Sequence, residues 1–127
     1  MQDKHLFEYA VIRIVPRVER EEFINVGVIL YCRDLKYLNS KYTINEDRLK
    51  ALCDQLDCTE VLEHLKSFER ICSGNAEGGP IAKLDIASRF RWLTATRSTI
   101  VQSSKVHPGF CTDPTATLNK LFNQLVT

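Results

Sequence analysis

Two apolar segments near the N-terminus, separated by a short charged stretch, constrain the fold most. Phe7 to Val15 is rich in aromatic and β-branched residues and ends at Pro16, and a second apolar segment, Phe23 to Cys32, follows the charged run Arg17 to Glu22. Such residues favour strands, and proline cannot donate a hydrogen bond to a β-ladder. Two consecutive strands joined by a short loop predict an antiparallel hairpin.

The second apolar segment also predicts which of its faces is buried. Every other residue from Ile24 to Cys32 is apolar, whereas the opposite face includes Asn25 and Gly27. A period of two is typical of a strand with one face in the core. An amide and a glycine are disfavoured in a fully buried strand, so we interpret Gly27 as a β-bulge or a place of close packing.

The remaining pattern adds helices and shorter strands. We expect a third strand over Tyr37 to Thr43 and a later strand over Thr99 to Ser103. Between them we expect a helix capped by Asn45, a helix that begins at Asp57 or Thr59 and stops at Gly74, and a helical turn over Phe90 to Leu93. Asp113 and Pro114 predict the start of a terminal helix. The chain therefore predicts one α+β domain over residues 1–127, with a mostly antiparallel sheet of about four strands and helices packed on one face.

Composition excludes several classes of protein. The net charge of +1 gives no general attraction to nucleic acid, which we regard as a disfavoured partner, and no apolar run is long enough to span a bilayer. No signal-peptide pattern follows Met1, so we expect a cytoplasmic protein without a membrane partner. The five cysteines are odd in number and form no C-x-x-C pair, so we predict neither disulfides nor zinc, and no cofactor.

The stretch from Arg89 to Pro114 carries an unusual density of hydrogen-bonding groups, including six hydroxyl residues up to Ser104. Each polar group that is buried needs a partner, so we predict a site or an interface here. In one interpretation Trp92 is a stacking platform beside arginines that bind phosphates. In the other, which we favour for Trp92, the indole is core and Arg97 braces the loop. The two interpretations stay equally open for Arg97, Ser98 and Thr99, and Gln102 belongs to the same candidate site.

Polar residues at the first hairpin form a second constellation. Arg13, Glu22 and Asn25 together could bind a phosphate, a carboxylate or a nucleotide edge. The alternative is an ion pair that closes the hairpin loop, with Asn25 bonded to backbone. We favour the alternative, because polar groups near turns usually bond locally.

His107 suggests general-base or metal chemistry with Cys111 and Asp113 nearby. We favour a structural interpretation, in which Asp113 caps a helix and His107 closes a turn with Pro108 and Gly109. No second histidine or paired carboxylate stands at ligand spacing, so we predict no metal site and no catalytic residue.

Four segments carry a resemblance to a known family. They are Y-A-V-I-R-I-V-P at Tyr9 to Pro16, E-F-I-N-V-G-V-I-L at Glu22 to Leu30, R-F-R-W-L-T-A-T-R-S-T-I-V-Q at Arg89 to Gln102, and V-H-P-G at Val106 to Gly109. In combination they resemble the bacterial domain-of-unknown-function family numbered 3037, over nearly the whole chain. The family usually has proline at the position of Thr96, and often another near Ser103 and Ser104.

The resemblance implies a partner more than a substrate. The family has no established activity, and its members are small stand-alone bacterial proteins often encoded beside a HipA-like kinase. Our leading hypothesis is therefore a non-catalytic interaction or regulatory partner of such a kinase. It would dock through Asn25, Gly27 and the Arg97 to Gln102 strand.

Two alternative functions and the oligomeric state stay open. An enzyme acting on a phosphate-bearing or nucleotide substrate would bring Arg13, Arg97 and His107 together in one pocket. A single-stranded nucleic-acid binder would expose Trp92 beside Arg89 and Arg91. A homodimer could form through an exposed edge strand.

Overall fold

The computed structural model describes residues 3–97 and 99–126. The elements follow the order β1 (His5–Ile14), η1 (Val18–Arg20), β2 (Ile24–Cys32), β3 (Tyr37–Tyr42), α1 (Glu46–Leu52), α2 (Cys58–Ser73), η2 (Ala76–Gly78), η3 (Pro80–Lys83), α3 (Ile86–Leu93), β4 (Val101–Ser103), β5 (His107–Cys111) and α4 (Pro114–Leu125). No helix within these two ranges is long and apolar enough to cross a membrane.

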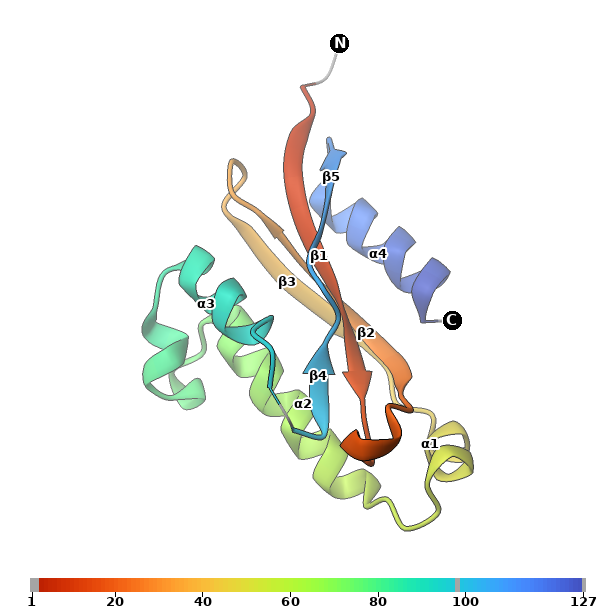
Figure 1. Cartoon of the computed structure of the whole chain (residues 1–127). Coiled ribbons are helices and arrows are strands. Elements are labelled where there is room, and N and C mark those ends of the chain that lie inside the picture. Colours follow the sequence, from red (N-terminus) through yellow and green to blue (C-terminus); the bar gives the residue numbers. More distant parts are fainter. Residues whose placement is uncertain (1–2, 98, 127) are drawn as a thin grey trace.

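The strands form one antiparallel sheet organised around β1. The order is β3-β2-β1-β4, and β5 also pairs with β1, so β4 and β5 follow one another along the same edge of the central strand (Figure 1). The α+β class and the antiparallel sheet are confirmed. The sheet has five strands rather than about four, because β5 begins with His-Pro-Gly, which the sequence pattern favoured as a turn.

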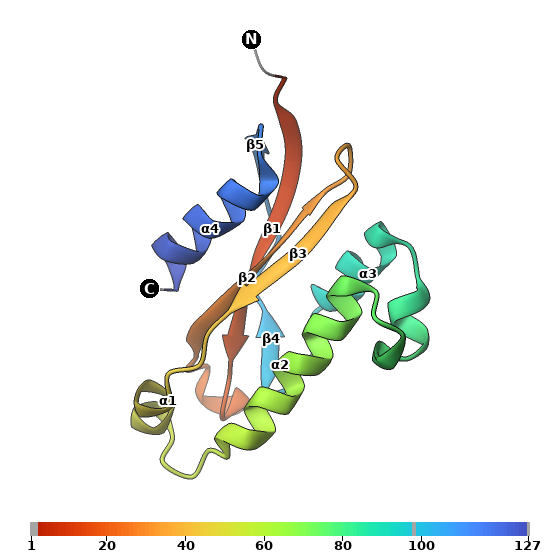
Figure 2. The same ribbon diagram turned by 180° about the vertical axis from the view of Figure 1, so that it is seen from behind.

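Helices lie against both faces of the sheet (Figure 2). The larger core joins β1 residues such as Ile12 and Ile14 to α2 and α3, and a second core joins Phe7 and Val28 to α4. Strand β2 is buried continuously from Val26 to Cys32, as expected for a strand covered on both sides. The sequence pattern predicted helices on one face only, because Asn25 and Gly27 interrupt the second apolar stripe of β2.

Polar caps set the helix boundaries, largely where the sequence predicted them. The side chains of Asn45, Asp57 and Asp113 accept hydrogen bonds from the first turns of α1, α2 and α4. Helix α3 is longer than the predicted helical turn, because Asp85 caps it by accepting a bond from the Ser88 N–H at 2.9 Å. Gly74 ends α2 with a left-handed φ of 75°.

Gly27 has the structural role that the sequence predicted. The register between β1 and β2 shifts where Ile12 pairs with Gly27 and Arg13 pairs with Asn25, which is a β-bulge. A Cβ atom at Gly27 would lie 2.6 Å from the Lys41 carbonyl oxygen on β3. Because that atom is backbone, it cannot move aside easily, so the β2–β3 approach requires glycine here.

Ser104 fills the gap between β4 and β5 along the edge of β1. Its backbone N–H donates to the Val11 carbonyl at 2.8 Å, and its Oγ accepts from the Val11 N–H at 2.8 Å. The hydroxyl also donates to the Lys105 carbonyl at 2.9 Å, and the side chain is buried. The Ser104 hydroxyl thus replaces the strand partner that Val11 would otherwise lack, because buried backbone groups need partners.

Replacing Ser104 by alanine should destabilise the sheet. Ser104→Ala leaves the buried Val11 N–H without its acceptor, at a cost of about 1–3 kcal/mol in the free energy of unfolding. Urea denaturation measures this change. Ser103→Ala is the matched control, since among the described residues the half-buried Ser103 hydroxyl bonds only the adjacent Ser104 carbonyl. Equal effects of the two substitutions would contradict the assigned role.

The cysteines divide into buried and partly accessible thiols. Cys32, Cys72 and Cys111 are buried, Cys53 and Cys58 are half-buried, and none of the five is in a disulfide. Burial raises the pKa of the Cys72 thiol to about 11. At neutral pH Cys72 is therefore protonated and unreactive, because the thiolate is the nucleophile.

Alkylation of the folded protein should follow this division. We expect iodoacetamide near neutral pH to modify Cys53 and Cys58 and to leave Cys72 unmodified until urea unfolds the chain. Peptide mass spectrometry measures the extent of alkylation at each cysteine, and fragmentation between Cys53 and Cys58 separates these two sites. Labelling of Cys72 in the folded protein at the rate of Cys58 would show that this core position is accessible.

Candidate functional site

A cavity of about 160 Å³ lies between α2, the C-terminal end of α3 and β4. It includes three of the residues predicted to form a binding site, Arg97, Thr99 and Gln102. The other lining residues are His64, Ser67, Phe68, Ile71, Trp92, Leu93, Ala95, Val101 and Ser103.

The cavity combines buried apolar walls with an exposed polar rim. Phe68, Ile71 and Leu93 belong to the larger core, and their side chains are almost fully buried. Trp92 and His64 are exposed. An apolar recess with a few polar groups at its mouth is the usual construction of a binding pocket.

Trp92 is exposed, so the prediction that it is core is wrong. The buried side of α3 carries Phe90 and Leu93, and the indole, two positions after Phe90, points to another side of the helix and is 38% exposed. The Arg97 guanidinium lies 4.0 Å from the centre of the Trp92 rings. The Arg97 side chain also donates a hydrogen bond to the Trp92 carbonyl, which is the backbone contact expected in one of the two interpretations left open for Arg97.

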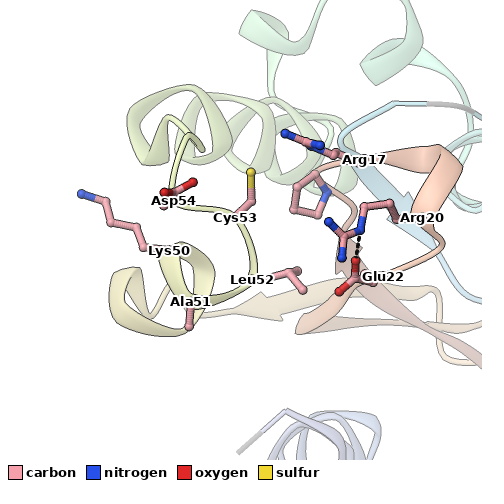
Figure 3. Close-up of a pocket in the computed structure, with 9 residues that line it drawn as sticks. Arg17, Arg20, Glu22, Lys50, Ala51, Leu52, Cys53 and Asp54 are labelled. Carbon is pink, nitrogen blue, oxygen red and sulfur yellow. Dashed lines mark ion pairs between the residues drawn. The ribbon is translucent and has the colours of Figure 1, made fainter.

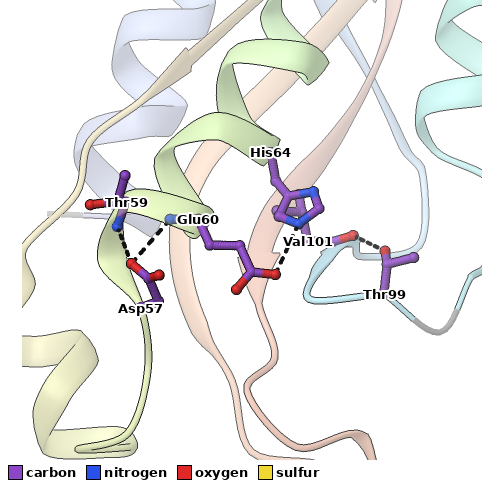
Figure 4. Close-up of polar contacts among 6 residues, drawn as sticks. All are labelled: Asp57, Thr59, Glu60, His64, Thr99 and Val101. Carbon is purple, nitrogen blue, oxygen red and sulfur yellow. Dashed lines mark hydrogen bonds and ion pairs between the residues drawn. The ribbon is translucent and has the colours of Figure 1, made fainter.

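Thr99 and Gln102 bond mainly within their own turn. The Thr99 hydroxyl donates to the Val101 carbonyl at 2.7 Å (Figure 4), and the Gln102 amide donates to the Thr99 carbonyl at 2.9 Å. These bonds fix the rim of the cavity and satisfy the polar groups that made the segment conspicuous. Ser98, a further candidate, lies outside the described residues.

His64 also lines the cavity, although the sequence pattern did not predict it as a site residue. Its Nε2 lies 3.7 Å from a carboxylate oxygen of Glu60, one helical turn earlier on α2 (Figure 4). Its side chain is about half exposed, at 48%. The sequence signal was a histidine beside the apolar stripe of α2, and only the tertiary structure brings α2 against β4.

The hairpin constellation forms separate contacts rather than one site. The Arg13 guanidinium lies 4.1 Å from the centre of the Phe23 ring, and Asn25 Nδ2 donates to the Leu125 carbonyl of α4 at 3.2 Å. Glu22 forms an ion pair with Arg20. Asn25 bonds to backbone and Glu22 forms a loop ion pair, as in the favoured interpretation, but the partner of Glu22 is Arg20 and not Arg13.

The docking face proposed from the sequence is therefore divided. Asn25 contacts α4, which covers one face of the sheet, whereas Arg97 lines a cavity bounded by α2 and α3 on the other. Gly27 is buried. The hypothesis that these residues form one surface is wrong, because the sheet separates them.

The predicted turn at His107 is also wrong. His107, Pro108 and Gly109 belong to β5, and the imidazole ring lies 5.4 Å from the ring of Tyr9, its partner on β1. Cys111 stands four residues along the same strand, about 13 Å away at the usual rise of a strand, so the two cannot act as a pair. Asp113 caps α4, as expected.

Neither alternative function finds its required arrangement. The cavity beside Arg97 is lined by neither Arg13 nor His107, so the convergence expected of the enzyme is not observed there. Trp92 is exposed, but Arg91 forms an ion pair with Glu8 at 2.7 Å. Arg89 packs so closely on Gly74 that a Cβ atom there would meet its guanidinium. The arginines expected beside the indole are therefore committed elsewhere.

Comparison with known proteins places the chain in a family. The sequence profile of the family described as "Protein of unknown function (DUF3037)" matches residues 9–126, nearly the whole chain. No curated protein and no solved structure matches this chain. The resemblance inferred from the sequence segments is confirmed: the chain belongs to the DUF3037 family.

Proposed function

We propose that this protein is a non-catalytic interaction module that binds a protein partner at the cavity between α2, α3 and β4. The single observation that carries the proposal is the exposed Trp92 indole, held by Arg97 at the mouth of an apolar recess. Tryptophan and arginine are the residue types most enriched among interface positions that dominate binding energy.

The rim is organised before any partner arrives. Arg97 bonds the Trp92 carbonyl, Thr99 bonds the Val101 carbonyl, and Gln102 bonds the Thr99 carbonyl. Side chains that are already fixed lose less conformational entropy on binding, which favours affinity. The dense hydrogen bonding of this segment therefore supports a binding role, although each bond also has a structural role.

The cavity defines the chemistry of the partner. Phe68, Ile71 and Leu93 offer space for one apolar side chain. Arg97 has five N–H donors, more than its one bond to the Trp92 carbonyl uses, so an acidic group of the partner can bind beside the indole. We therefore propose a partner segment with an apolar anchor next to an acidic residue.

The family resemblance supplies the candidate partner, a HipA-like kinase. Gene adjacency is an association rather than a contact, so the kinase is part of the proposal and not of the structure. A regulatory subunit needs a docking surface but no catalytic groups of its own, which agrees with an apolar recess whose polar rim is bonded internally.

Co-purification with the neighbouring kinase tests the proposal. We expect wild-type protein to form a complex, and Trp92→Ala to weaken it by about thirtyfold or more, the scale of a dominant interface residue. Arg97→Ala should weaken it less, because the indole remains. Calorimetric titration of the purified proteins measures these changes.

Phe110→Ala is the matched control. Phe110 is another exposed aromatic residue, 70% accessible, on β5 and outside the cavity lining. The Phe110→Ala substitution should leave the affinity for the kinase unchanged, and thermal unfolding of each variant checks that the fold is intact. Absence of a wild-type complex, or a Phe110→Ala effect as large as that of Trp92→Ala, would overturn the proposal.

A further inference from the structure

A second and larger cavity lies beside the end of β1 that leads into the β1–β2 loop. It measures about 320 Å³ and lies between the β1–β2 loop and the end of α1 (Figure 3). One wall is formed by Pro16, Arg17, Arg20 and Glu22, and the other by residues 50–54. Its volume lies at the lower end of the range of small-molecule sites, roughly 300–1,000 Å³.

The loop wall has a defined backbone. Residues Val18–Arg20 form the 3₁₀ turn η1, in which the Arg20 N–H donates to the Arg17 carbonyl at 3.2 Å. Glu21 ends the turn with a left-handed φ of 55°. A residue other than glycine rarely adopts this conformation, and such strain is concentrated at functional sites. The loop therefore presents its arginines from a fixed turn.

The charges of the cavity leave positive groups without a partner. Arg20 forms an ion pair with Glu22, which neutralises both (Figure 3). Among the described residues, Arg17 and Lys50 have no carboxylate within ion-pair distance. Arginine binds phosphate oxygens through paired N–H donors, and lysine adds a point charge.

Asp54 adds a second recognition element. Its side chain is exposed in the same cavity and has no ion-pair partner within the part of the chain that the structure describes. A carboxylate can only accept hydrogen bonds, so it disfavours a simple anion but suits the hydroxyl groups of a sugar. Cationic and hydroxyl-accepting groups together match a molecule that carries both phosphate and hydroxyls.

We propose that this cavity binds a small phosphate ester of a hydroxylated molecule, such as a sugar phosphate or a nucleoside monophosphate. Arg17 holds the phosphate, Lys50 adds positive charge from the opposite side of the cavity, and Asp54 accepts from a hydroxyl group (Figure 3). Leu52 and Cys53 form the less polar wall beside the rest of the ligand. The site is separate from the partner cavity, since the two share no lining residue.

Nuclear magnetic resonance titration of the full chain tests the site, with ribose 5-phosphate, adenosine monophosphate, inorganic phosphate and citrate as probes. We expect saturable shifts for the two phosphate esters, confined to residues 16–22 and 50–54, at about millimolar dissociation constants. Asp54→Asn should weaken the binding of ribose 5-phosphate but not that of inorganic phosphate. Tighter binding of citrate than of either ester would overturn the phosphate assignment.

A pair of double variants isolates the two cationic side chains. Arg17→Gln with Lys50→Gln should raise the dissociation constant of ribose 5-phosphate by about tenfold or more, equivalent to about 1.4 kcal/mol. Arg33→Gln with Lys36→Gln is the matched control, because it removes the same charges from the exposed β2–β3 turn. Absence of saturable shifts, or an equal loss in both variants, would overturn the proposal.

Protection of Cys53 gives an independent readout. Cys53 lines the cavity, whereas Cys58, at the start of α2, does not. Saturating ribose 5-phosphate should slow alkylation of Cys53 and leave that of Cys58 unchanged. Equal rates with and without ligand would contradict occupancy of this cavity.

Discussion

The central strand β1 must be paired along both edges and covered on both faces, and the rest of the structure depends on this constraint. Strand β2 pairs with one edge, while β4 and β5 share the other. Ala10, Ile12 and Ile14 are completely buried. A chain of this length can bury such a strand only by placing helices on both sides of the sheet, which explains why α4 returns to the face opposite α2.

The shared edge of β1 also explains the polar segment that follows α3. Two short strands meet there, and the gap between them leaves the Val11 N–H without an acceptor from either strand, so the Ser104 hydroxyl accepts its hydrogen bond. Upstream, bonds from Arg97, Thr99 and Gln102 shape the approach to β4. Many of the hydroxyl and guanidinium groups in this segment thus form hydrogen bonds with an irregular backbone. The candidate site arises where this fixed backbone leaves Trp92 exposed beside an apolar recess.

Much of the fold could be predicted from local signals. The hairpin, the bulge at Gly27 and the caps at Asn45, Asp57 and Asp113 depend on residues close in sequence. Strand β5 could not be predicted in this way, because Pro108 and Gly109 suggest a turn unless β1 supplies a partner edge. For the candidate site, the sequence found Arg97, Thr99 and Gln102. It placed Trp92 in the core and missed His64, since both depend on how α2 and α3 pack against β4.

Amide hydrogen exchange in the free protein tests the central role of β1 most directly. The account predicts that the amides of residues 10–14 exchange slowest, at free energies near that of global unfolding, and that the outer strand β3 and the short β5 exchange faster. It further predicts that Ser104→Ala accelerates exchange at Val11 before it affects β3. Exchange of β1 as fast as that of β3, in the wild-type protein, would contradict the claim that β1 organises the fold.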